Sequence, residues 1–413
     1  MPALHRLRTF LGLRRSMVGM LGMAVLVGLG EHMAERFLPI YLMALGGGAY
    51  AIGLLNGLDN LLGALYAFPG GYLADRLGTK RALLVFNILA MTGYVVVILV
   101  PAWPAVIVGA FFFLSWSAIS LPAVMKLVTQ VLPATKRTMG VSMHSLVRRI
   151  PMALGPVMGG AFIGIWGEIS GVRLAFASAL IMALVALVMQ QRLIEEDHHR
   201  GTVETPPAAE KNPLRLWRAM PPVLKRLLVA DILVRFCEQI PYAFVVVWCM
   251  KVIAAPVTAL QFGILTAIEM ATAVLVYIPV AHLADRSGKK PFVVMTFGFF
   301  TLFPLALWFS RSLVPLVFAF VLRGLKEFGE PTRKALILDL APEDRKAGMF
   351  GLYYLIRDTV VSVAAFGGAA LWQIGPEANF LVAFVFGLLG TLWFAAQGRD
   401  LTGSGAQSTA TTT

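Results

Sequence analysis

The chain has 413 residues, of which 58% are hydrophobic and 14% are charged, and its mean hydropathy is +0.77. A soluble protein of this size needs more polar surface to cover its core, so the composition excludes that class. Several apolar runs reach about 20 residues, enough to cross a hydrocarbon core of ~30 Å as helices, whereas membrane β-barrel strands alternate in short segments. We therefore expect an all-α, multi-pass membrane protein.

The first residues, MPALHRLRTFLGLRRS, are basic and amphipathic and predict a segment that lies at the membrane interface. A cleaved signal peptide is disfavoured because the apolar stretch that follows carries four polar residues, Glu31, His32, Glu35 and Arg36. Twelve transmembrane helices are expected next. They cover about residues 17–43, 48–73, 82–101, 104–132, 139–166, 174–191, 227–250, 258–284, 291–310, 313–340, 347–374 and 376–397.

A polar segment divides these helices into two sets of six. It contains EEDHHRGTVETPPAAEKNP, whose charge and proline content predict a flexible linker. The predicted organisation is an N-terminal six-helix bundle over residues 1–191, a cytoplasmic linker over 192–226, a C-terminal six-helix bundle over 227–397 and a cytoplasmic tail over 398–413.

The net charge of +13 invites a nucleic-acid partner, but its distribution points to membrane topology instead. Of the 35 Lys and Arg residues, 22 fall in the tails and in the loops on the side of the termini, and three fall in the opposite loops. This asymmetry is the positive-inside signal, and it predicts that both termini are cytoplasmic. We expect a multi-pass protein of the plasma (inner) membrane, without a nucleic-acid partner.

The sequence lacks the patterns that a metal site, a cofactor site or a catalytic site requires. Cys237 and Cys249 are the only cysteines, and they have no spacing typical of metal ligands. The glycines of GGGAY, at 46–50, follow no strand and precede no Lys-Ser/Thr pair, so they do not predict a phosphate-binding loop. We expect no metal, no cofactor and no enzymatic activity.

The tetrapeptide Leu-Ala-Asp-Arg occurs at 73–76 and again at 283–286, 210 positions later (283 − 73). Other matches at offsets of 207 to 210 pair Glu31 with Glu238, Asp59 with Glu269, Pro69 with Pro279, Arg148 with Arg357, and Gly159 with Gly368. A near-constant offset over so long a stretch predicts an internal duplication of a six-helix unit, the kind of repeat from which one class of transporter is built.

These motifs resemble those of the major facilitator superfamily over nearly the whole chain. The family's loop signature, Gly-x-x-x-Asp-Arg/Lys-x-Gly-x-Lys/Arg-Lys/Arg, is matched in full by Gly71, Asp75, Arg76, Gly78, Lys80 and Arg81. The second copy keeps Asp285, Arg286 and Gly288 but has Ala281 in place of the first glycine. In the fifth predicted helix, Gly155, Pro156, Gly159 and Gly160 resemble the end of the family's antiporter motif, although Ser142 and Pro151 replace its upstream glycines.

This resemblance implies a fold of two pseudo-symmetric six-helix bundles that expose a central site alternately to each side, in the manner of a drug/proton antiporter. It also implies that Asp75 acts in a gate near the cytoplasmic start of helix 11. A carboxylate at a helix N-terminus is stabilised by roughly 0.3–1 kcal/mol, a size that suits a latch that opens in each cycle. The alternative is an ordinary solvated turn, which Gly78 permits.

Charged residues inside the predicted spans are the second signal, because each must face a cavity or a partner rather than lipid. They avoid helices 3, 6, 9 and 12, which the resemblance places on the lipid side. On helix 7, Asp231, Arg235 and Glu238 share one face. The candidate cavity residues are His32, Glu35, Arg36, Lys126, Arg148, Arg235, Arg323, Lys326, Glu327, Glu330, Arg357 and Asp358.

Four acids near mid-membrane depth, Glu31, Asp59, Glu238 and Glu269, form two repeat-related pairs and are candidates for carrying a coupling proton, with Glu31 and Asp59 favoured. Arg148 is a candidate for gripping an anionic substrate group or for pairing with Asp59. Arg357 is expected to pair with the adjacent Asp358. Many of the other charges could equally pair with one another.

We therefore expect a monomeric secondary transporter whose partners are a small-molecule substrate, protons and the lipid bilayer. Proton-coupled efflux of small or amphipathic organic molecules is favoured by the antiporter-like motif and the embedded acids. Proton-coupled uptake of an organic anion and transport of a lipid-like substrate are the alternatives. A non-transporting membrane receptor or scaffold is the alternative from another class.

Overall fold

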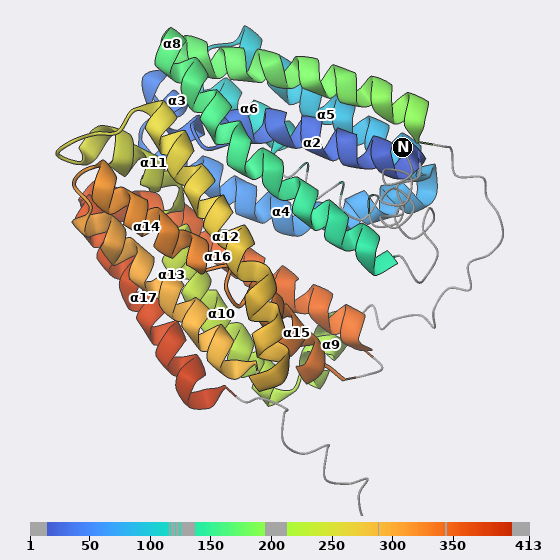
Figure 1. The fold of residues 1–413 in the computed structure, drawn as a ribbon, viewed down its shortest axis with the longest axis vertical. Helices are drawn as coiled ribbons and strands as arrows, with labels where there is room; N and C mark the ends of the chain where they lie inside the picture. Colours follow the sequence, from blue (N-terminus) through green and yellow to red (C-terminus); the bar gives the residue numbers. More distant parts are fainter. Residues whose placement is uncertain are drawn as a thin grey trace, which may run out of the picture. The chain divides into compact units, whose positions relative to one another are not determined.

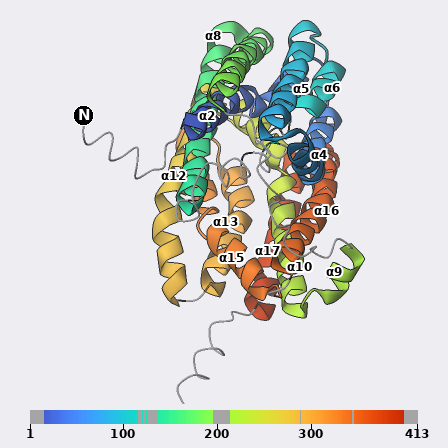
Figure 2. The same cartoon turned by 90° about the vertical axis from the view of Figure 1, so that its right-hand side faces the viewer.

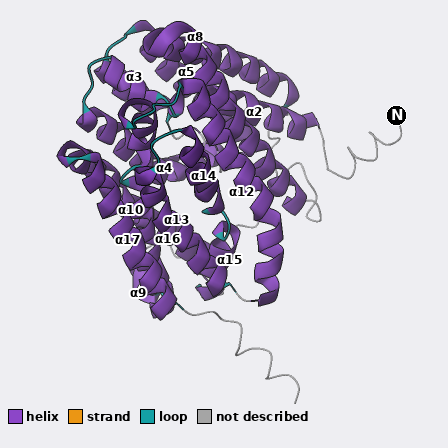
Figure 3. Cartoon of the chain, turned by 60° about the vertical axis from the view of Figure 1, so that its left-hand side comes forward, coloured by secondary structure: helices purple, strands orange, loops and turns teal. Residues whose placement is uncertain are grey.

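The computed structural model describes residues 15–114, 116, 120, 124, 137–194, 213–287, 289–342 and 345–398. This part of the chain is almost entirely helical and contains no strand (Figure 3). Seven stretches within it are helices long and apolar enough to cross a membrane. The predicted all-α membrane fold is therefore confirmed.

The chain forms two compact units. Unit 1 comprises residues 1–200 and 243–270, and unit 2 comprises residues 201–242 and 271–413. In unit 1, α2 (Arg15–Glu35) lies alongside α8 (Arg137–Leu193), and the other helices are α3 (Leu38–Ala44), α4 (Ala49–Leu77), α5 (Thr79–Leu99) and α6 (Trp103–Phe113) (Figure 1). The short helix α11 (Val245–Val247), a π-helical turn (Trp248–Val252) and the start of α12 (Ala259–Ser287) also belong to unit 1.

Unit 2 is built around α10 (Pro222–Gln239), α13 (Lys290–Phe309) and α17 (Pro376–Gln397), which pack against one another (Figure 1). The other helices of this unit are α9 (Pro213–Ala219), α14 (Leu313–Leu325), α15 (Glu330–Leu340) and α16 (Lys346–Ile374). Its buried core draws on α9, α10, α13, α15, α16 and α17, through residues such as Leu224, Phe297, Leu336, Tyr353 and Phe394.

Each predicted span coincides with helix in the described residues, but several boundaries differ. Helices 5 and 6 join almost directly, because Gly167 adopts a φ of +79° and turns the chain where a seven-residue loop was expected (167–173). The span expected over 313–340 is not continuous. It is divided by a turn at residues 326–329, where Gly329 precedes α15 and Pro331 occupies its first turn.

Each unit contains a close helix contact at a glycine, and the two contacts involve repeat-related residues. A side chain on Gly159 would lie 1.9 Å from the carbonyl oxygen of Met33, and one on Gly368 would lie 2.3 Å from that of Ile240. Gly159 and Gly368 are matched at the 209-residue offset, and Met33 and Ile240 at the 207-residue offset that also relates Glu31 to Glu238. The same close helix contact therefore occurs in both halves of the chain, as a duplication predicts.

Candidate functional site

Two predicted spans are interrupted at corresponding positions of the repeats. α2 ends at Glu35 and α3 begins at Leu38. α10 ends at Gln239, and the chain continues as a 3₁₀ turn from Tyr242. At the 207-residue offset, Glu35 corresponds to Tyr242, which lies three residues after the end of α10, so the two breaks fall within about one helical turn of each other in the duplicated unit. In transporters built from repeats, paired interruptions of this kind mark ion and substrate sites.

Proline residues lie at both breaks. Pro39 occupies the first turn of α3, and Pro241 follows the end of α10. Proline lacks an amide hydrogen, so inside a helix it cannot donate the hydrogen bond to the carbonyl group four residues before it. On α17, the amide of Asn379, which is fully buried, donates to the carbonyl oxygen of Ile240 at 3.3 Å and to that of Gly368 at 2.8 Å. The carbonyl group of Ile240, at the end of α10, is therefore hydrogen-bonded by a side chain of α17.

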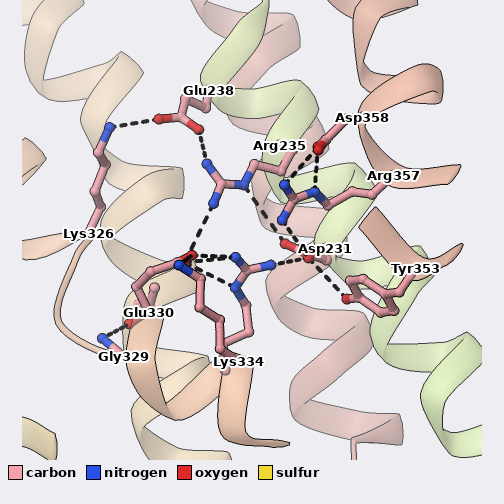
Figure 4. A network of polar contacts seen from close by, with 12 residues as sticks. Asp231, Arg235, Glu238, Lys326, Gly329, Glu330, Lys334, Tyr353, Arg357 and Asp358 are labelled. Atoms are coloured by element: carbon pink, nitrogen blue, oxygen red, sulfur yellow. Dashed lines mark hydrogen bonds and ion pairs between the residues drawn. The ribbon is translucent and has the colours of Figure 1, made fainter. Parts of the chain in front are cut away.

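In unit 2, charged side chains from α10, the turn after α14, α15 and α16 form one polar network (Figure 4). Asp231, which is 1% exposed, is its most deeply buried acid. Its carboxylate forms an ion pair with Arg333, accepts a hydrogen bond from Tyr353 at 3.0 Å and lies 3.5 Å from a guanidinium nitrogen of Arg357. Asp231 thus links α10 to both α15 and α16.

Glu238 lies seven residues further along the same face of α10. One of its carboxylate oxygens accepts from Lys326 at 2.6 Å, and the other accepts from Arg235 at 2.6 Å. Arg235 and Lys326 also approach the ring of Phe300, at 5.2 and 5.6 Å from the ring centroid. Two cations thus hold one acid beside an aromatic face, an arrangement that combines ion pairing with cation–π attraction.

Glu330 completes the network at the start of α15. Its carboxylate binds the guanidinium of Arg333 in bidentate fashion, at 2.7 and 2.8 Å from Nη2, and lies 3.5 Å from Arg235 and 3.4 Å from Lys334. The acid sits at the N-terminus of α15, where the helix dipole also favours negative charge. Glu330 therefore connects the Asp231 and Glu238 parts of the network.

The prediction that Arg357 pairs with Asp358 is confirmed, at 2.7 Å. Four other members of the network were not among the predicted site residues: Asp231, Arg333, Lys334 and Tyr353. Sequence spacing offered a signal for each of them. Arg333 and Lys334 follow Glu330 by three and four residues, Asp231 precedes Arg235 by four, and Tyr353 precedes Arg357 by four, so each lies on the same helix face as a candidate.

Arg323 is buried on α14 among aromatic rings. Its guanidinium carbon lies 5.1 Å from the ring centroid of Phe303, 5.5 Å from that of Tyr242 and 5.8 Å from that of Phe320. Glu327, the remaining candidate from this stretch, lies in the turn between α14 and α15. The candidates expected within one continuous span, 313–340, are thus spread over two helices and the turn that joins them.

In unit 1, the candidates of α2 and α4 form a second, smaller cluster. His32 Nδ1 lies 2.6 Å from a carboxylate oxygen of Glu35. Asp59 has no hydrogen bond and no ion pair among the residues that the structure describes, and the charges that act on it electrostatically belong to Glu35, Glu31, Arg36 and His32. Glu31 is buried, while Asp59 is half-buried. Among the described residues, the charges that act on Asp59 are thus those of two carboxyl groups, one arginine and one histidine.

The remaining candidates lie elsewhere or outside the described residues. Arg148 is half-buried on α8, and Glu269 is 1% exposed on α12. Lys126 and Gly288 fall outside the described residues, as do the side chains of Asp75, Asp285 and Arg286. The gate predicted from the two Leu-Ala-Asp-Arg motifs therefore remains a prediction.

The other five residues of the first motif are described. Gly78, with φ +82° and ψ 155°, separates α4 from α5 in a backbone conformation that glycine permits. Arg76 donates to the hydroxyl of Tyr72 at 3.3 Å, and Lys80 donates to the carbonyl oxygen of Gln191 at 2.8 Å. Gly71 lies within α4, and Arg81 is exposed in the first turn of α5.

The glycines of the antiporter-like motif pack two different helices against α8. A side chain on Gly155 would lie 2.8 Å from Cβ of His32, on α2. A side chain on Gly160 would lie 2.3 Å from the carbonyl oxygen of Ala259, at the start of α12. A side chain on Gly263, which belongs to α12, would lie 2.3 Å from the carbonyl oxygen of Pro156. The motif thus places α2, with its charged cluster, and α12 at backbone contact distance from α8.

Unit 1 also contains an ion pair between two segments that the predicted topology places on the side away from the cytoplasm. Lys251, at the end of the π-helical turn, pairs with Glu168, which follows the turn at Gly167. Phe37 and Phe262 pack edge to face in the same unit, with their ring centroids 5.8 Å apart. Segments of the second repeat, residues 243–270, are therefore joined to the first-repeat helices on this side.

Comparisons with known proteins agree with this architecture. The model of the Major Facilitator Superfamily matches residues 20–258 and 232–411. An uncharacterized MFS-type transporter of Methanocaldococcus jannaschii is 22% identical over 375 residues, which are 88% of this chain and 90% of that protein.

Solved structures share the fold at low sequence identity. The peptide transporter POT has a TM-score of 0.76 at 15% identity and covers 93% of both chains. A bacterial homologue of the human lysosomal transporter Spinster, in an inward-facing and occupied conformation, has a TM-score of 0.71 at 13% identity and covers 92% of this chain and 96% of its own. Together with the family match, the duplicated helical fold shows that this chain is a transporter of the Major Facilitator Superfamily.

Proposed function

We propose that this transporter couples the export of small or amphipathic organic molecules to proton entry, and that the carboxyl groups of unit 1 carry the proton. The observation that carries this proposal is the position of Asp59. This residue has no ion pair within the described residues and lies within electrostatic range of two other acids, Glu35 and Glu31. A proton bound among these three groups would relieve their mutual repulsion in a poorly solvated interior.

The two clusters differ in a way that supports separate roles. In unit 2, each of Asp231, Glu238, Glu330 and Asp358 has a cationic partner within 4.0 Å, so protonating any of them breaks an ion pair. In unit 1, the Asp59 carboxylate has no ion pair within the described residues, so protonating it breaks none. Among the four predicted proton carriers, Asp59 is therefore favoured over Glu238, and the buried Glu31, which lies within electrostatic range of Asp59, is the next choice. Glu269 remains a further candidate.

The unit 2 network offers the chemistry for substrate contact. Around Glu238 and Arg323, charged groups lie against aromatic rings, and both clusters sit next to breaks in helices. An amphipathic molecule with one charged end would meet matching charged and apolar surfaces there. The antiporter-like glycine contacts of α8 support export rather than uptake. The protein would act as a monomer in the plasma membrane with cytoplasmic termini.

A thermal-shift screen of the purified full-length protein at two pH values tests this function. A ligand that binds the folded state raises its melting temperature, and a ligand whose binding is linked to a proton does so to different extents at the two pH values. We expect hits among amphipathic organic molecules, with pH-dependent shifts. Hits with identical shifts at both pH values would contradict proton coupling, and the absence of any transport of those hits by reconstituted protein would contradict the transport function.

Uptake of an organic anion is the second candidate, and one observation favours it. The unit 2 network contains five cationic side chains, Arg235, Lys326, Arg333, Lys334 and Arg357, against four acids. A substrate carboxylate could replace Glu238 between Lys326 and Arg235. In the same screen, this candidate predicts that short organic anions, rather than amphipathic molecules, raise the melting temperature.

A further inference from the structure

The short helix α9 precedes α10 at the end of unit 2 (Figure 2). One stripe of it anchors in the core, because Leu216 and Met220 are 5% and 2% exposed. Its other stripe carries Leu214 and Trp217, which are 69% and 40% exposed. A helix facing water gains nothing from two large apolar side chains on its outer face, whereas a helix at a membrane surface buries them in the interface.

The same segment is uniformly basic. Between Pro213 and Ala230 the chain has four basic residues, Arg215, Arg218, Lys225 and Arg226, and no acidic residue. Arg215 and Arg218 lie on the exposed side of α9. Lys225, from the first turns of α10, places its ammonium group 4.8 Å from the ring centroid of Trp217. Basic and aromatic groups are therefore interleaved on one surface.

A second tryptophan lies beside this surface. The indole N–H of Trp393, near the end of α17, donates to the carbonyl oxygen of Arg226 at 3.3 Å, and the side chain is 42% exposed. Tryptophan is enriched at membrane interfaces, where its ring lies at headgroup depth and its N–H finds a polar partner. Trp217 and Trp393 thus mark the depth at which α9 meets the bilayer.

We propose that α9 and the start of α10 form a docking surface for the headgroups of anionic phospholipids. The four basic side chains contact the phosphate groups, while Leu214 and Trp217 enter the boundary between headgroups and acyl chains. The four positive charges that the sequence places in this segment complement an anionic lipid surface. Because α9 packs against α16, which carries Tyr353 and Arg357, a bound lipid also steadies the helix that holds part of the charged network.

The test uses full-length protein reconstituted into vesicles of phosphatidylcholine with increasing fractions of phosphatidylglycerol, in which one of the two lipids is brominated to quench tryptophan. We expect stronger quenching by brominated phosphatidylglycerol than by brominated phosphatidylcholine, and a smaller difference in the Trp217→Phe variant, in which Trp393 still lies beside the surface. The double variant Arg215→Gln/Arg218→Gln is expected to weaken the preference for phosphatidylglycerol by roughly 25-fold, at about fivefold for each basic residue removed.

The matched control is Arg192→Gln/Arg311→Gln, which removes the same charge from exposed positions outside α9 and should leave the preference unchanged. Equal quenching by the two lipids in the unmodified protein would overturn the proposal. An equal loss in the control variant would also overturn it, because net charge rather than α9 would then set the preference. Protection of Trp217 from both brominated lipids would show that another occupant, such as an acidic protein segment, covers the surface.

Discussion

Asp231 is the carboxylate at which three helices of unit 2 meet. Its partners come from α15 and α16, and the residue itself is almost completely buried. Removing one member of a buried ion pair leaves the other charges without compensation, at a cost of about 3–5 kcal/mol. By contrast, Lys334, which is 49% exposed, pairs with Glu330 at the surface, where an ion pair contributes about 0–1 kcal/mol.

We predict that Asp231→Asn lowers the free energy of unfolding by about 3–5 kcal/mol, because Arg333 and Arg357 lose their shared counter-charge. Lys334→Gln, the control, should lower it by less than about 1 kcal/mol. Denaturant unfolding of the purified protein in detergent, followed by circular dichroism, measures both. Equal and small effects of the two variants would show that Asp231 does not hold the three helices together.

Neutralising Asp59 and neutralising Glu238 are predicted to have different effects on the stability of the folded protein. Asp59→Asn removes a carboxyl group that has no ion pair among the described residues, so the folded state should keep its stability while the pH dependence of ligand binding is lost. Glu238→Gln breaks two contacts of 2.6 Å with Lys326 and Arg235 and should destabilise the protein. Thermal shifts with and without ligand at two pH values separate the two outcomes. A destabilised Asp59→Asn protein would contradict the proposed role of this residue.

At the scale of the elements, close helix contacts depend on glycines that a sequence motif only partly identifies. Gly155, Gly159 and Gly160 belong to the antiporter-like motif, and each meets a neighbouring helix backbone or Cβ atom. The motif indicated that these glycines matter, but not which helix each one meets. That information depends on how α2 and α12 pack against α8, which a single sequence does not contain.

We predict that Gly159→Ala is destabilising, because the added methyl group would lie 1.9 Å from the carbonyl oxygen of Met33 and must separate α2 from α8. Overpacking of this kind costs about 1–3 kcal/mol or more. Gly164→Ala, on the same helix, is the control, since nothing lies within 4 Å of its added methyl group. Alanine there should be neutral or stabilise the helix by up to about 1 kcal/mol. Similar melting temperatures for the two variants would refute the close contact.

The ion pair between Lys251 and Glu168 gives a prediction about movement. Alternating access requires each side of the membrane to open in turn, so this pair should separate during the cycle. Replacing both residues with cysteine and joining them with a short thiol-reactive crosslinker should stop transport. Each single cysteine variant, treated identically, should remain active. Full activity of the crosslinked double variant would show that these segments stay together throughout the cycle.

At the scale of the whole molecule, the fold follows from the sequence more completely than the site does. Hydropathy and the repeated offset predict the all-α transporter fold, since each span must satisfy its backbone hydrogen bonds internally. The helix breaks were missed because membrane helices tolerate proline, so Pro39 and Pro241 did not mark the end of a predicted span. Pairing was predicted correctly for the neighbours Arg357 and Asp358, whereas the alternative pairing of Arg148 with Asp59 does not occur among the described residues. The contact of Lys326 with Glu238 joins residues 88 positions apart, and only the packed bundle brings them together.

The measurement that tests the central claim most directly is proton exchange on ligand binding. Isothermal titration of the purified protein with a ligand from the thermal-shift screen, in buffers of different ionisation enthalpy, gives the number of protons taken up or released. We predict a pH-dependent exchange in the unmodified protein and in the control Glu377→Gln, an exposed acid on α17, and its loss in Asp59→Asn. Binding without proton exchange at every pH, or unchanged exchange in Asp59→Asn, would contradict proton coupling through the carboxyl groups of unit 1.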